Sequence, residues 1–315
     1  MNSAIKKVFI IFILVLLVFA AFLCMAGCTV NKGSISYHVP YSSSDLPQTS
    51  EHSSSPAVIS ESPQSDEPLP SSSASICGNS AAQGQASQKS VLRSIPVLMY
   101  HSVAYEKNNP VRIPQEKFKE QMKYLKDNGY STLSLDDLYS YFEEGISVPE
   151  KSVVLTFDDG YEDNYKNAYP ILKEYSFKAS IFIITDNIDK KSYLTSSELK
   201  ELDENGISIE SHTVTHRKLQ ELSYDEQLKE LENSKEILEK LLNKKVIYAA
   251  YPYGSYNKDT IKAAKDAGYT MAFTTDGRWA GKEDGLLTLD RVYISGFFNL
   301  DTFKERITNP NYKIQ

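Results

Sequence analysis

From about residue 95 onward, short apolar runs alternate along the chain with longer segments whose apolar residues recur every three or four positions. The run 95–100 is rich in strand-forming residues, and the segment 114–128 places Phe118, Met122 and Leu125 on one helical stripe. The same pattern predicts four more strands, each followed by a helix: 153–157 with 164–175, 179–184 with 196–204, 207–210 with 223–242, and 246–249 with 258–267. A last strand is predicted at 270–274, before an irregular loop.

Strands that alternate with helices in this way predict an α/β fold with a mostly parallel sheet. Residues 91–315 hold about six or seven such units, which favours a closed barrel over an open sheet. In these folds the chemistry sits at the carboxyl ends of the strands. We therefore expect functional side chains directly after the predicted strands.

Residues 1–27 have the features of an export signal, because Lys6 and Lys7 precede an almost wholly apolar run. The run ends in Met-Ala-Gly before Cys28, which resembles the bacterial lipoprotein box, in which the cysteine takes a diacylglycerol. We expect cleavage before Cys28 and a lipid anchor on the outer face of the cell membrane. An uncleaved membrane anchor is the alternative, because the apolar run is close to the shortest that spans a bilayer.

Residues 28–90 change abruptly to serine, proline, glutamine and small residues. This composition cannot bury enough apolar surface to offset the entropy of ordering the chain, so we predict a disordered tether. One large domain remains at 91–315, and its histidines are His101, His212 and His216.

Composition narrows the possible partners and sites. The formal net charge of −7 argues against nucleic acid as a partner. Three cysteines in the whole chain cannot form a disulfide-rich scaffold or a four-thiolate zinc site. Any metal site must therefore use histidine and carboxylate ligands.

Two adjacent carboxylates, Asp158 and Asp159, follow a predicted strand and precede Gly160. They repel each other at such close range, so an ionised pair needs a cation or strong hydrogen-bond donors. A solvated Asp-Asp-Gly turn is the alternative.

Two imidazoles, His212 and His216, follow another predicted strand at a spacing that lets both bind one ion. With one of the two aspartates they form a His₂-carboxylate set with open positions, the pattern of a catalytic metal, and the second aspartate is free to act as a base.

These motifs resemble those of the polysaccharide deacetylases, carbohydrate esterase family 4, whose domain is the NodB-homology domain. The resemblance covers about 95–292 and includes 156–160 (Thr-Phe-Asp-Asp-Gly), 211–216 (Ser-His-Thr-Val-Thr-His) and 251–254 (Tyr-Pro-Tyr-Gly). It implies a distorted (β/α)₇ barrel. It also implies the following site: Asp158 as general base, Asp159 as metal ligand with His212 and His216, and Pro252 with the backbone N–H of Tyr253 at the oxyanion and substrate.

Two departures from the family pattern change the expected site. Ala249 and Ala250 stand where the family usually has the arginine that holds the catalytic aspartate, and the late Leu-x-His motif, which supplies the acid, is missing. The exported poly-β-1,6-N-acetylglucosamine deacetylases are similar in carrying Met-Tyr-His near the start of the domain, here ending at His101. We expect His101 to be the general acid and Arg291 to hold Asp158; an ordinary ion pair is the alternative for Arg291.

The resemblance implies metal-dependent N-deacetylation of an extracellular or cell-wall polysaccharide that contains N-acetylglucosamine. Zn²⁺ is the expected metal, with Co²⁺, Ni²⁺ and Mn²⁺ as alternatives that such ligands also accept. Trp279, the only tryptophan, either stacks on a sugar ring or packs in the core. An O-acetyl esterase acting on xylan and a catalytically silent glycan-binding lipoprotein are the alternative functions.

Overall fold

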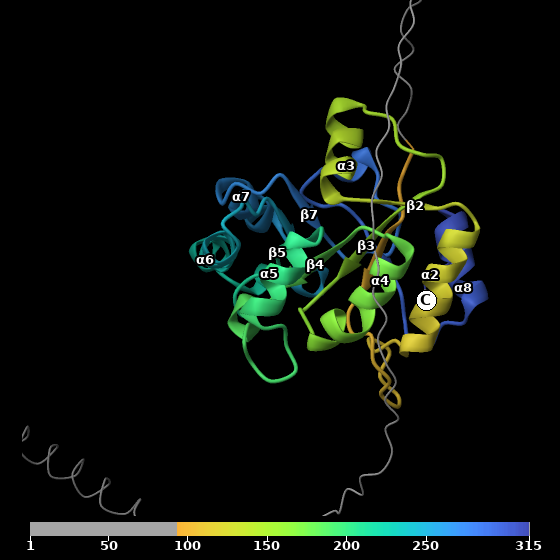
Figure 1. The fold of residues 1–315 in the computed structure, drawn as a ribbon. Helices are drawn as coiled ribbons and strands as arrows, with labels where there is room; N and C mark the ends of the chain where they lie inside the picture. Colours follow the sequence, from red (N-terminus) through yellow and green to blue (C-terminus); the bar gives the residue numbers. More distant parts are fainter. Residues whose placement is uncertain (1–92, 315) are drawn as a thin grey trace, which may run out of the picture. The chain divides into compact units, whose positions relative to one another are not determined.

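The computed structural model describes residues 93–314, which form an α/β domain (Figure 1). The predicted signal peptide 1–27, the lipid attachment at Cys28 and the tether 28–90 lie outside the described residues and stay predictions. Across 93–314, none of the helices combines the length and the apolar character needed to span a bilayer.

The strands pair side by side in a parallel sheet with the order β7-β6-β5-β4-β3-β1-β8, while the short β2 pairs with the beginning of β3. They are β1 (Val97–Tyr100), β2 (Ser131–Leu133), β3 (Ser152–Phe157), β4 (Ala179–Ile183), β5 (Ile207–Ser211), β6 (Tyr248–Ala250), β7 (Met271–Phe273) and β8 (Val292–Tyr293).

One segment connects the two edges of this sheet. The N–H of Ala272 in β7 donates to the carbonyl of Leu286, and the N–H of Thr274 donates to the carbonyl of Leu289. The chain then continues directly into β8, which pairs with β1. Segment 286–293 therefore curls the sheet into a distorted barrel, as the sequence predicts.

Helices cover the outer face of the sheet, and α6 packs against α7 while α2 packs against α4 and α8 (Figure 1). The α-helices are α2 (Gln115–Asp127), α3 (Leu135–Tyr139), α4 (Tyr169–Tyr175), α5 (Ser196–Glu204), α6 (Tyr224–Leu242), α7 (Lys258–Asp266) and α8 (Leu300–Thr308). The shorter turns are η1 (Ser140–Glu144) and η2 (Asn164–Ala168), which are π-helical, and η3 (Thr185–Asn187), η4 (Leu219–Glu221), η5 (Pro252–Gly254) and η6 (Lys282–Asp284), which are 3₁₀.

Local sequence explains where the helices begin. Ser223 caps α6 by accepting a hydrogen bond from the N–H of Glu226, whose carboxylate accepts from the Ser223 N–H. Thr195 caps α5 in the same way. Such capping boxes satisfy N–H groups that have no partner inside the helix.

Alternate residues of each strand enter two different cores. Val153 and Leu155 pack under the outer helices, whereas Val154 faces inward with Phe182 and Phe273. Leu138 and Phe142, from α3 and η1, join this inner core and close one end of the barrel. The interior is therefore packed, and the open end lies opposite α3.

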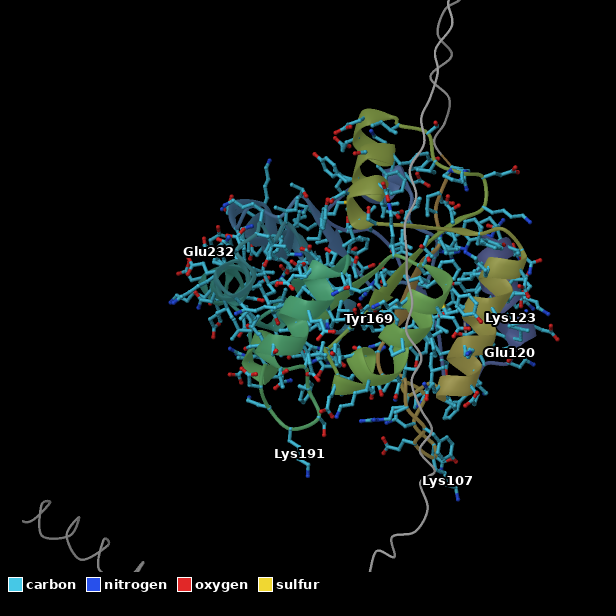
Figure 2. All side chains as sticks on the ribbon, viewed as in Figure 1. Lys107, Glu120, Lys123, Tyr169, Lys191 and Glu232 are labelled. Carbon is cyan, nitrogen blue, oxygen red and sulfur yellow. The ribbon has the colours of Figure 1, made fainter. Side chains whose placement is uncertain are left out.

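The carboxyl ends of the strands meet at that open end. Lys107, in the loop after β1, and Lys191, in the loop after β4, both project from the lower side of the domain in Figure 2, away from α3 in Figure 1. This is the edge where the sequence places the candidate site.

The predicted elements are confirmed with small shifts, and several were missed. The helix expected at 164–175 begins as the π-helical η2, and the strand expected at 246–249 is Tyr248–Ala250. The segments β2, α3, η1, β8 and α8 were not predicted. The strands β2 and β8, of three and two residues, are too short to show a period.

We predict that Phe182→Ala lowers the free energy of unfolding by about 3–5 kcal/mol, because it leaves a cavity in the inner core. Phe182 is 0% exposed. Phe297→Ala is the control, since Phe297 is 62% exposed, and it should change stability by less than about 0.5 kcal/mol. Urea unfolding followed by circular dichroism measures both; equal losses would contradict this assignment of the core.

Candidate active site

Asp159, His212 and His216 converge from the loops after β3 and β5. Oδ1 of Asp159 lies 3.5 Å from Nε2 of His212 and 3.4 Å from Nε2 of His216. The three potential ligand atoms all lie within 4.8 Å of one another. The structure therefore brings together the three residues that the sequence proposes as metal ligands.

The hydrogen bonding of these side chains fits a cation between them. The Nδ1–H of His212 donates to the carbonyl of Ala250 (2.8 Å), so a neutral ring turns the lone pair of Nε2 towards Asp159. Burial lowers the pKa of His212 to about 3, which keeps the ring neutral. Oδ1 of Asp159 is buried and has no hydrogen-bond partner among the described residues. Lone pairs that face one another need a proton or a cation between them, and this donor set suits a divalent metal.

The charge on Asp159 is also poorly compensated by the chain. Burial raises the pKa of its carboxyl to about 6, and the neighbouring charge of Asp158 acts in the same direction. A cation would reverse this effect, because it favours the ionised carboxylate.

The backbone around the site is strained. Asp159, Thr213, His216 and Tyr253 adopt φ values of 74°, 65°, 60° and 59°, in the left-handed region. Each costs of order 1–3 kcal/mol for a residue other than glycine, so neighbouring contacts must hold it in place. Because the backbone at Asp159 is left-handed, its side chain points in a different direction from that of Asp158.

Glu230 of α6 holds the loop between the two histidines. Its Oε2 accepts from the N–H groups of Val214 (3.0 Å) and Thr215 (2.9 Å), and its Oε1 accepts from the Thr215 hydroxyl (2.6 Å). The sequence analysis missed Glu230. The available signal was an acidic residue on the buried stripe of α6, where a charge needs polar partners.

Asp158 is buried against the fully buried Arg291. Both guanidinium nitrogens Nη1 and Nη2 donate to the carboxylate at 2.7 Å, and Arg291 Nε–H donates to the carbonyl of Thr274 at 3.0 Å. Burial alone would raise the pKa of Asp158, but the charge and hydrogen bonds of Arg291 outweigh it and hold the pKa well below its usual range. Asp158 is therefore ionised and fixed in direction at neutral pH.

His101 directly follows β1, next to Asp158. The parallel register pairs Tyr100 with Phe157, and the N–H of Asp158 donates to the carbonyl of Tyr100 (2.9 Å). The charge of His101 acts to lower the pKa of both Asp158 and Asp159. His101 is partly exposed, and its Nδ1 is buried without a hydrogen-bond partner among the described residues.

Tyr253 lies at the rim, in η5 after β6. Its ring centroid is 4.6 Å from that of His216, and the residue is 61% exposed, while Pro252 beside it is buried. Gly254 is required there, because its φ is +65° and a Cβ would lie 2.7 Å from the backbone nitrogen of Thr275.

Trp279 lies with the core. It packs against the outer core, and its Nε1–H donates to the carbonyl of Arg306 in α8 (2.7 Å). The structure thus supports the packing interpretation of Trp279, and no contact in the described residues joins it to the metal ligands.

A family model described as polysaccharide deacetylase matches residues 145–272. This range includes Asp158, Asp159, His212 and His216, but neither His101 nor Arg291.

Similar proteins extend this match. The polysaccharide deacetylase YxkH of Bacillus subtilis is 41% identical over 201 residues, which are 64% of this chain and 71% of that protein. The poly-β-1,6-N-acetyl-D-glucosamine N-deacetylase of Staphylococcus aureus is 32% identical over 197 residues, 58% of this chain and 68% of that protein.

Among solved structures, the Streptococcus pyogenes deacetylase PplD in complex with acetate has a TM-score of 0.66 and 34% identity, covering 68% of this chain and 98% of PplD. The barrel is thus of the NodB type, whose regular form is a (β/α)₇ barrel. The matched motifs, the fold and the relatives together show that this chain is a hydrolase that belongs to the polysaccharide deacetylase family.

Proposed function

We propose that this protein is a metal-dependent N-deacetylase of a polysaccharide that contains N-acetylglucosamine. The observation that carries the proposal is the pair of adjacent carboxylates in two different environments. Asp159 faces two imidazole nitrogens, whereas Asp158 is held by the two guanidinium nitrogens of Arg291. Asp159 is thereby suited to bind a metal, and Asp158 is suited to accept a proton.

Asp159, His212 and His216 would hold the cation. Zn²⁺ is the metal we propose, because His₂-carboxylate sets bind it in other hydrolases, and Co²⁺, Ni²⁺ or Mn²⁺ can replace it. A bound divalent cation supplies Lewis acidity, which lowers the pKa of water and polarises an acetyl carbonyl.

The remaining residues of the site have separate roles in the reaction. Asp158, ionised and oriented by Arg291, takes the proton from the attacking water. The backbone N–H of Tyr253 stabilises the developing oxyanion. A protonated His101 then gives a proton to the departing amine, which leaves poorly without one.

The preferred substrate is a β-1,6-linked N-acetylglucosamine polymer. The Staphylococcus aureus relative bears the name of an enzyme for this polymer, and the position of His101 after β1 agrees with the Met-Tyr-His motif of such enzymes. We further propose that the lipid at Cys28 tethers the domain outside the cell, within reach of such a polymer.

Replacing Asp158 by Asn tests the function. Asp158→Asn removes the base but keeps the volume, and acetate release from β-1,6-linked N-acetylglucosamine oligomers should fall by at least about 10²-fold. Asp186→Asn, at an exposed aspartate after β4, is the control and should release acetate at the normal rate. Unchanged release by Asp158→Asn would refute the proposal, and release from acetyl xylan alone would favour an O-acetyl esterase.

Metal binding can be tested without activity. Zn²⁺ at about 100 times its Kd should stabilise the metal-free protein by about 2.7 kcal/mol, seen as a higher Tm. His216→Ala should abolish this shift, because it removes one ligand from a partly exposed position. His101→Ala should keep the shift; losing it in both variants, or in neither, would contradict the assigned ligand set.

Arg291 should keep the titration of Asp158 below the pH range in which the enzyme works. A base must be deprotonated to act, so activity is lost as the pH falls through the pKa of Asp158. In Arg291→Gln, burial is no longer offset by the guanidinium, so this pKa rises and activity is lost at a higher pH than in the wild type. Arg291→Lys, which keeps the charge, should shift the acid limb of the pH profile less. Profiles of kcat/KM measure the shift, and an unmoved limb in Arg291→Gln would speak against Asp158 as the base.

A further inference from the structure

Three consecutive residues after β1, His101, Ser102 and Val103, are hydrogen-bonded to one short stretch of chain. This stretch comprises Asp163 and the π-helical turn η2, and it begins only a few residues after the Asp158-Asp159 pair. Single π-helical turns are rare and frequently occur at functional sites.

Asn164, the first residue of η2, contacts the backbone of His101 directly. Its Nδ2 donates to the carbonyl oxygen of His101 at 2.7 Å, and its side chain is almost fully buried, with 1% exposed. Its own N–H donates to the carbonyl of Tyr161 (3.0 Å), so it is tied to the loop that carries Asp159. Asn164 thus joins the end of β1 to the end of β3.

Asp163 and Asn167 hold the next two residues. Oδ2 of Asp163 accepts from the Ser102 hydroxyl (2.6 Å), and its Oδ1 accepts from the Val103 N–H (2.8 Å). Nδ2 of Asn167 donates to the Val103 carbonyl at 2.8 Å. The His101 ring lies edge-on to that of Tyr293, with the ring centroids 6.3 Å apart, and its Nδ1 has no hydrogen-bond partner within the described residues. The hydrogen bonds to the backbone of 101–103 therefore fix the point from which this ring extends.

We propose that Asn164 is a positioning residue for the acid step, acting through the backbone of His101. This inference rests on the proposed role of His101. The carbonyl contact sets the place of the imidazole relative to Asp158, so that the proton donor and the proton acceptor belong to one rigid unit. Within the described residues, no hydrogen bond joins Asn164 to Asp159, His212 or His216.

The chemistry of the leaving group separates positioning from a merely structural role. An amine must be protonated to leave, whereas the 4-nitrophenolate of 4-nitrophenyl acetate leaves without a proton. Asn164→Ala should lower kcat for N-acetylglucosamine oligomers by about 10–10²-fold, with KM and the rate on 4-nitrophenyl acetate nearly unchanged. The ester rate of the same preparation also reports that the variant is folded and loaded with metal.

Asn167→Ala is the matched control, because Asn167 lies on the same turn and makes the same kind of bond, two residues beyond His101. It should change the amide-to-ester ratio by less than about 2-fold. If Asn164→Ala does not fold, Asn164→Asp removes the donor while keeping the volume. The double variant Asn164→Ala/His101→Ala should be no slower on the amide than His101→Ala alone, since both act on one step.

Two results would overturn the inference: equal losses on amide and ester in Asn164→Ala, or losses that add in the double variant. Failure of the proposed function would give different results from these. In that case the wild type releases no acetate from the oligomers, or His101→Ala leaves the amide-to-ester ratio unchanged.

Discussion

Two carboxylates side by side in a barrel must each find a positive charge. Asp158 finds it within the chain, in a fully buried guanidinium that grips both of its oxygens. Asp159 turns away through a left-handed backbone and faces two neutral imidazoles, and a cation bound by all three would supply its positive charge. The two identical side chains thus have different charge partners, which gives each a separate chemical role. The strained loops around them hold the two carboxylates in these different surroundings.

Much of this arrangement could be predicted from the sequence, because it depends on local features. The alternation of strand and helix patterns indicated the barrel, and the positions of Asp158, His212 and His216 directly after strands indicated one shared edge. The small number of histidines made the site easier to predict, because all three histidines of the domain lie after strand ends on this edge.

The parts that could not be predicted depend on contacts across long stretches of chain. Glu230 lies inside a long helix, and nothing in its neighbours along the sequence shows that it accepts hydrogen bonds from the loop before His216. Asn164 and His101 stand 63 positions apart, and no local pattern of the sequence shows that they make contact. The strand β8 was missed because two residues show no period.

The closing segment of the barrel is also a chemical component of the site. Segment 286–293 joins β7 to β1 through β8, and it contains the guanidinium that neutralises Asp158. Without this segment, the folded barrel would bury Asp158 with no guanidinium beside it. The strand that closes the barrel is thus also the strand that completes the site, and a chain that ends before it lacks both.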